Sequence, residues 1–171
     1  MLRKTRRQNP LLLQWQSHFA SQNKEDYMAS EDTIKLLREC NSGVQMGIYS
    51  MEEIIDDVKQ EEFKKILTDS IHRHKELGDR THNLLSKEGE ENKEPNPMLK
   101  GMSWMKTNAK MMMDDSDNVC ADLITDGCNM GIKSLYRYLN EYKNASEDAK
   151  KLTEDIIQEE ETLRQDLREY L

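Results

Sequence analysis

Few residues in this chain combine a reactive side chain with a spacing that supports catalysis. The three cysteines, Cys40, Cys120 and Cys128, form no Cys-x-x-Cys pair, and no histidine lies near them in the sequence. Neither a glycine-rich phosphate loop nor a Gly-x-Ser-x-Gly motif occurs. The sequence therefore indicates no nucleophile for covalent catalysis and no phosphate-binding loop.

Histidine and carboxylate side chains are the remaining groups that could do chemistry, as metal ligands. Two Asp-x-x-His pairs, at 69–72 and 79–82, fall on helix faces that the apolar pattern turns toward solvent. His74 and Glu160 are different, because each interrupts an apolar stripe near its middle. These two residues are therefore the ionisable groups that we expect in the core.

Helices must position both residues, because the composition disfavours strands. Valine, isoleucine, phenylalanine and tryptophan are sparse, whereas the helix formers glutamate, lysine, leucine and methionine dominate. Apolar residues recur at helical spacing, which predicts an all-α chain with helices near 31–58, 62–86, 117–143 and 147–170. Ser30-Glu31-Asp32-Thr33 is expected to cap the first helix, and a methionine-rich stretch predicts a short helix near 100–113.

The two halves of the chain repeat each other. A shift of 88 residues superposes the first and third predicted helices, with the pairs Leu36–Ile124, Cys40–Cys128 and Gly43–Gly131. A shift of 86 superposes the second and fourth helices and places His74 on Glu160. The sequence therefore predicts two copies of an antiparallel helical hairpin, joined by the long charged connection 87–116.

Two hairpins joined in this way resemble the ferritin-like superfamily. The paired Cys-Asn-x-Gly stretches, Trp104 in the connection and the pattern from Asp117 to Tyr138 resemble more narrowly an uncharacterised bacterial branch, a domain of unknown function. The resemblance covers residues 30–171. It implies a ferritin-like four-helix bundle with a long crossover that contains a short helix.

The resemblance also implies that a metal centre is missing. Di-iron members supply one Glu from each of two helices and a Glu-x-x-His from each of the other two. At the positions of the two lone glutamates, this chain has Gly43 and Gly131. His74 and Glu160 stand at the positions of the two Glu-x-x-His glutamates, and leucine replaces both histidines. Only His74 and Glu160 remain as metal candidates in the core.

The same resemblance predicts how these positions meet. Matching positions on helices two and four face each other, so His74 and Glu160 are expected to form a buried pair where metal would lie. Glu160 should raise the pKa of His74 above about 6.5, although burial opposes this shift. Gly43, Gly47 and Gly131 are expected to permit close helix crossing, with Gly43 and Gly131 approaching each other.

The amino terminus differs in charge from the rest of the chain. Its first 24 residues contain five cations and no acid, whereas the whole chain has a net charge of −8. We expect residues 1–29 to be a basic, disordered extension, and Met28 resembles a natural start that would make 1–27 an upstream extension. Action through this arm on membranes or nucleic acid is a third hypothesis that rests on residues 3–7 alone.

The sequence favours a non-catalytic, cytoplasmic bundle that acts through a protein partner or as a homo-oligomer, without cofactor, membrane or nucleic acid. No stretch approaches the roughly 20 apolar residues of a membrane span, no signal peptide is recognisable, and the three cysteines are expected to be buried thiols in a reducing compartment. The alternative is a metal-binding or redox protein of the ferritin-like class. It would hold iron or another divalent metal with His74, Glu160 and stripe-edge acids such as Glu39 or Asp126.

Overall fold

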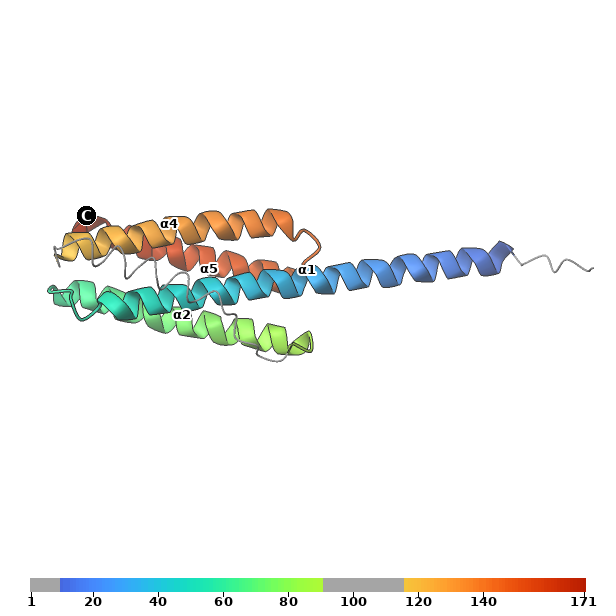
Figure 1. Cartoon of the computed structure of the whole chain (residues 1–171), viewed down its shortest axis with the longest axis horizontal. Helices are drawn as coiled ribbons and strands as arrows, with labels where there is room; N and C mark the ends of the chain where they lie inside the picture. Colours follow the sequence, from blue (N-terminus) through green and yellow to red (C-terminus); the bar gives the residue numbers. More distant parts are fainter. Residues whose placement is uncertain (1–9, 91–115) are drawn as a thin grey trace, which may run out of the picture.

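The structure is a computed structural model that describes residues 10–90 and 116–171, with side chains from residue 30 onward in the first range. It contains four long helices and one short 3₁₀ helix (Figure 1): α1 (Pro10–Ile54), α2 (Glu61–Lys87), α4 (Asp117–Glu141), α5 (Glu147–Asp166) and η1 (Leu167–Tyr170). No strand occurs in these two ranges, which confirms the all-α prediction for this part of the chain. The helix predicted near 100–113 lies outside the described residues.

The four helices pack side by side in antiparallel pairs. In the first pair, Lys75 of α2 donates to Glu52 of α1 over 2.8 Å, and Ser30 donates to Glu88 at the other end. In the second pair, Arg164 of α5 donates to Asn129 of α4 over 3.0 Å. The last residues of α2 and the first of α4 lie at opposite ends of the bundle (Figure 1).

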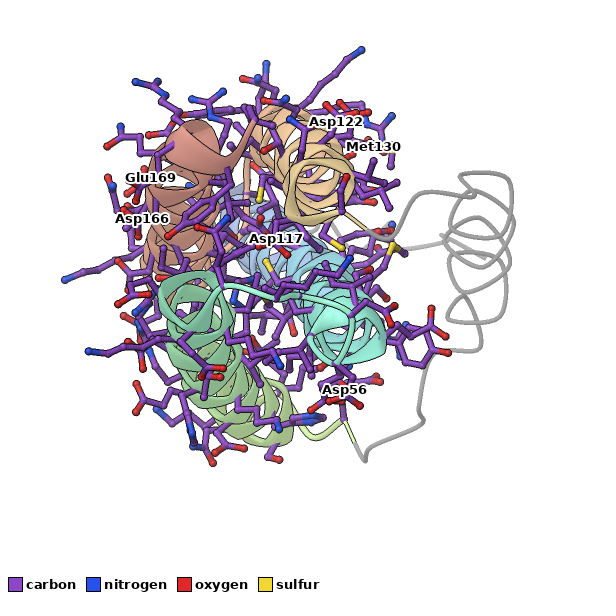
Figure 2. The ribbon with its side chains drawn as sticks, turned by 90° about the vertical axis from the view of Figure 1, so that its left-hand side faces the viewer. Asp56, Asp117, Asp122, Met130, Asp166 and Glu169 are labelled. Carbon is purple, nitrogen blue, oxygen red and sulfur yellow. The ribbon has the colours of Figure 1, made fainter. Side chains whose placement is uncertain are left out.

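The apolar stripes meet in a continuous core between the helices. Figure 2, a view along the helices, shows them around a common centre, with the labelled acids Asp56, Asp122, Asp166 and Glu169 at the periphery. The largest fully buried side chains come from α1, α2, α5 and η1 and include Leu36, Met51, Phe63, Leu152, Leu163 and Leu167. No helix in the described part of the chain has an apolar stretch long enough to cross a bilayer.

Helix α1 begins at Pro10, whereas the sequence predicted a start near residue 31. Residues 10–29, expected to be disordered, are helical, and this part of α1 projects beyond the other helices (Figure 1). Proline suits the first position of a helix, and neither proline nor glycine recurs before Gly43. The chain therefore contains no breaker that would end the helix at the predicted boundary.

Asp32 and Thr33, expected to cap a helix start, instead lie inside α1 and hold the turn between α4 and α5. Asp32 Oδ2 accepts hydrogen bonds of 3.0 Å from both the backbone and the side-chain nitrogen of Asn144. Thr33 Oγ1 accepts one of 2.8 Å from the backbone of Ser146. Small polar side chains are common at helix caps because they accept hydrogen bonds from free backbone N–H groups. Asp32 and Thr33 do the same, but the N–H groups belong to the turn of the other hairpin.

Asp117 makes the reciprocal contact at the opposite end. Its two carboxylate oxygens accept from the backbone nitrogens of Lys59 and Gln60, over 2.7 and 3.1 Å. Gln60 is the N-cap residue of α2 and makes no capping bond with its own side chain. Each hairpin turn is therefore held by an aspartate from the other hairpin.

Replacing Asp117 with alanine is expected to lower the free energy of unfolding by about 1 kcal/mol, the usual effect of losing a helix cap. Chemical denaturation measures this, and Asp122→Ala is the control because Asp122 is an exposed acid on the same helix. Equal stability of the two variants would show that Asp117 does not act as the cap of α2.

Candidate functional site

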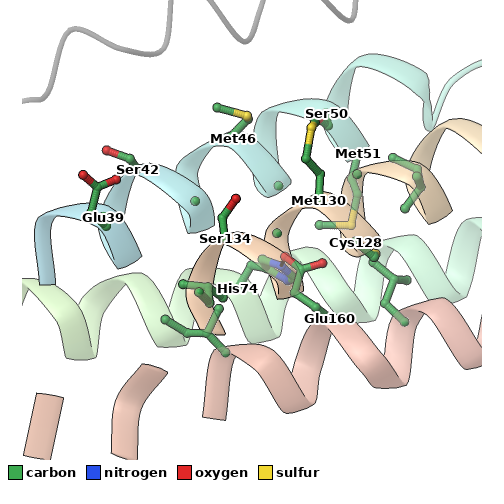
Figure 3. A pocket seen from close by; sticks show the side chains of 18 of the residues that line it. Glu39, Ser42, Met46, Ser50, Met51, His74, Cys128, Met130, Ser134 and Glu160 are labelled. Carbon is green, nitrogen blue, oxygen red and sulfur yellow. Dashed lines mark hydrogen bonds and ion pairs between the residues drawn. The ribbon is translucent and has the colours of Figure 1, made fainter. Parts of the chain in front are cut away.

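A cavity of about 610 Å³ opens between α1 and α4 (Figure 3). Small or apolar side chains make up most of its walls, including Ser42, Met46 and Ser50 from α1 and Met130 and Ser134 from α4. His74 of α2 and Glu160 of α5 lie side by side at its floor. The cavity and the polar pair are therefore parts of one site.

Glycines on the two facing helices leave this space open. A Cβ atom added to Gly47 would lie 3.1 Å from the His74 ring, and one added to Gly131 would lie 3.5 Å from Glu160 Oε1. A Cβ atom at Gly43 would have no neighbour within 4 Å. The predicted close approach of Gly43 and Gly131 is therefore wrong, because Gly43 faces the cavity and Gly47 is the α1 glycine that lies over the pair.

The structure brings His74 and Glu160 together in the core. His74 is fully buried, and its Nε2 atom lies 3.3 Å from Glu160 Oε1. On the other side of the ring, Nδ1 lies 2.9 Å from the carbonyl oxygen of Ser70, so Nδ1 must donate a proton there. If the ring carried only the proton on Nδ1, the lone pair of Nε2 would face a carboxylate oxygen, and two acceptors would repel each other. A hydrogen bond between Nε2 and Oε1 therefore needs one further proton.

A second pair lies beside the first and was missed by the sequence reasoning. Glu159 accepts hydrogen bonds from Arg73 Nε over 2.6 Å and from Ser70 Oγ over 2.8 Å. Arg73 and Glu159 are 86 residues apart, the same offset that superposes His74 on Glu160. The offset of 86 residues was therefore a sequence signal for this pair also.

Two opposing effects determine the protonation of His74. Burial lowers the pKa of the imidazole, but the hydrogen bond and charge of Glu160, the Ser70 carbonyl and the charge of Glu159 together outweigh it. The pKa of His74 is therefore raised above its ordinary value of 6.5. When His74 is protonated, its imidazolium and the carboxylate of Glu160 form an ion pair.

Replacing Glu160 with glutamine is expected to lower the pKa of His74 below its value in the wild type, because the neutral amide leaves burial as the main effect. The raised pKa makes the pair a source of stability at acidic pH. This contribution is fully present below the pKa of the unfolded chain and is lost as pH rises through the folded pKa. Nuclear magnetic resonance titration of the His74 ring protons checks the shift, and identical pKa values in the two proteins would mean that the side chains do not interact.

The cysteines near the site are unreactive. Burial raises the pKa of the Cys40 thiol to about 11, and Cys40 shares a hydrogen bond of 3.2 Å with Thr153. Burial, together with the charge of Glu160, raises the pKa of Cys128 still further. Because the thiolate is the nucleophilic form, neither residue is suited to covalent chemistry at neutral pH.

The described side chains do not gather into a metal site. Across residues 30–90 and 116–171, no three His, Cys, Asp or Glu side chains are arranged to hold a metal ion. Glu39 lies on the cavity wall away from the His74–Glu160 pair (Figure 3), and Asp126 is exposed on α4. Asp69, His72 and Asp79 are exposed, as the apolar pattern predicted, whereas His82 is half-buried.

Within the described residues, the site therefore offers the His74–Glu160 pair beneath an apolar cavity, and neither a reactive thiol nor a set of metal ligands. Comparison of this chain with models of known protein families, with curated proteins and with solved structures finds no match.

Proposed function

We propose that this chain is a non-catalytic helical bundle of the ferritin-like class that acts by binding another molecule. The order of its helices supports the class, since two antiparallel hairpins follow each other, with the end of α2 and the start of α4 at opposite ends of the bundle. The register of the repeat supports it too, because α2 begins at Glu61 and α5 begins at Glu147, 86 residues later.

The His74–Glu160 pair is the observation that carries the proposal. It occupies matching positions of α2 and α5, where ferritin-like metal ligands would be expected. Its two side chains lie within hydrogen-bonding distance of each other. A metal ion would have to break this pair and displace the proton that it shares. The facing positions Gly47 and Gly131 have no side chain to supply further ligands.

We propose that the bundle binds its partner through the side of α1 and α4 on which the cavity opens. This side has the cavity and the half-exposed Met130 at its rim. We propose a protein partner or a second copy of the chain as the molecule bound by the outer surface of these helices. The three free, buried thiols are consistent with a reducing compartment such as the cytoplasm.

Metal analysis tests the non-catalytic proposal. Purified protein is incubated with ferrous iron under anaerobic conditions, desalted and measured by elemental analysis, and we expect well below one iron per chain. About two irons per chain would contradict the proposal and favour the metal-binding alternative. The variant Glu160→Gln, which removes the carboxylate, distinguishes iron held at this site from iron bound elsewhere.

A further inference from the structure

The cavity has the size and composition of a small-molecule site. Its volume of about 610 Å³ lies within the range of roughly 300–1,000 Å³ that is usual for ligand pockets. Leucine, isoleucine and methionine side chains, such as Leu123, Ile124 and Met46, supply much of the lining. Such walls favour a ligand that is apolar over most of its surface.

One polar group at the floor has unused hydrogen-bonding capacity. Glu160 is about nine-tenths buried, and its carboxylate can accept about four hydrogen bonds. His74 Nε2 uses one of these, and the Cys128 thiol lies close enough to interact as well. The remaining capacity faces a space in which Gly47 and Gly131 leave room above the carboxylate. A hydrogen-bond donor on a ligand could therefore reach Glu160 from the cavity.

The charges at the site favour a ligand without net charge. His74 and Glu160 neutralise each other at the floor, and at the rim Arg38 is paired with Glu90. The carboxylate of Glu39 interacts with the Tyr138 hydroxyl. Among the described lining residues, a charged ligand would find no free partner of opposite charge, and burying it in this way is costly.

We propose that the cavity between α1 and α4 binds a neutral, largely apolar small molecule that donates a hydrogen bond to Glu160. This small molecule is additional to the protein partner or second copy that we propose above for the outer surface of the same helices. The iron content of the protein and the binding of an organic probe are separate measurements, so either proposal can fail while the other holds.

A matched pair of probes tests the ligand class. Isothermal titration of the full-length chain with 2-naphthol, which has a hydroxyl donor, is compared with 2-methoxynaphthalene, which has none. We expect 2-naphthol to bind about 10- to 100-fold more tightly, the range for a hydrogen bond to a charged acceptor. In Glu160→Gln this preference should fall several-fold, because the acceptor is then neutral.

A matched pair of variants tests the location. Ser134→Leu adds a large side chain inside the cavity, and Ser86→Leu makes the same change on the exposed side of α2. We expect Ser134→Leu to abolish binding of both probes and Ser86→Leu to leave it unchanged. If Ser134→Leu does not fold, Gly43→Leu provides a second way to fill the cavity, because a Cβ atom at this position meets nothing within 4 Å.

Several results would overturn the proposal. If the wild type and the folded cavity-filling variants bound the probes with equal affinity, the probes would bind outside the cavity. Equal affinity for the two probes would show that Glu160 accepts no hydrogen bond from the ligand. If the cationic analogue 2-naphthylmethylammonium bound most tightly, the ligand would not be neutral. If no probe binds the folded chain, the cavity does not take a ligand of this class and the proposal is wrong.

Discussion

Replacing His74 with leucine is expected to lower the free energy of unfolding by about 3 kcal/mol, because it leaves the Glu160 carboxylate in the core without its partner. Breaking a buried ion pair by removing one member typically costs about 3–5 kcal/mol. We expect the lower end of this range because Glu160 borders the cavity, where water can hydrate part of its charge. Chemical denaturation at neutral pH measures the difference.

The double variant His74→Leu/Glu160→Leu is the control for this experiment. Replacing both members with apolar residues removes the stranded charge, so its stability should return to within about 1 kcal/mol of the wild type or exceed it. If the double variant is less stable than His74→Leu alone, the packing of the two side chains contributes more to the free energy of unfolding than their charges do. If His74→Leu has wild-type stability, the pair makes no net contribution to folding.

Replacing Phe63 with alanine is expected to lower the free energy of unfolding by about 3–5 kcal/mol, the usual cost of removing a buried aromatic side chain. Phe63 is fully buried near the start of α2, and its ring stacks on Tyr170 of η1 with 4.7 Å between ring centroids. The substitution leaves a void where the first turn of α2 meets the carboxyl terminus of the chain. Thermal and chemical denaturation give the magnitude.

Phe63→Leu is the matched variant for this prediction. It retains most of the apolar volume but loses the stacked ring, so the cost should be clearly smaller than that of alanine. Similar losses for leucine and alanine would assign the stability to the ring contact with Tyr170 rather than to filled volume. A loss below about 1 kcal/mol for alanine would mean that this end of the core collapses around the void.

The register of the two polar pairs could be predicted because it follows from a local property of the chain. Helical periodicity identifies which residues share an inward face, and a constant offset of 86 residues relates the faces of α2 and α5. His74 and Glu160 follow from this offset, and so do Arg73 and Glu159. Their distances and hydrogen bonds required the packed helices.

The start of α1 and the role of Asp32 could not be predicted in the same way. A short polar side chain before an apolar stripe has the pattern of a helix cap, but it can equally accept hydrogen bonds from another segment. In the structure Asp32 bonds to Asn144, which is 112 residues away in the chain. No local pattern distinguishes a helix that begins at residue 31 from one that continues through it.

The helical class and the inward faces of the helices were readable from the amino acids alone, because they depend on side-chain type and spacing within single helices. The position of Gly47 rather than Gly43 over His74, and the cavity between α1 and α4, emerged only when the helices were packed together. The separation of two helices is set by how side chains from all four fill the space between them, and this depends on contacts between residues far apart in the chain.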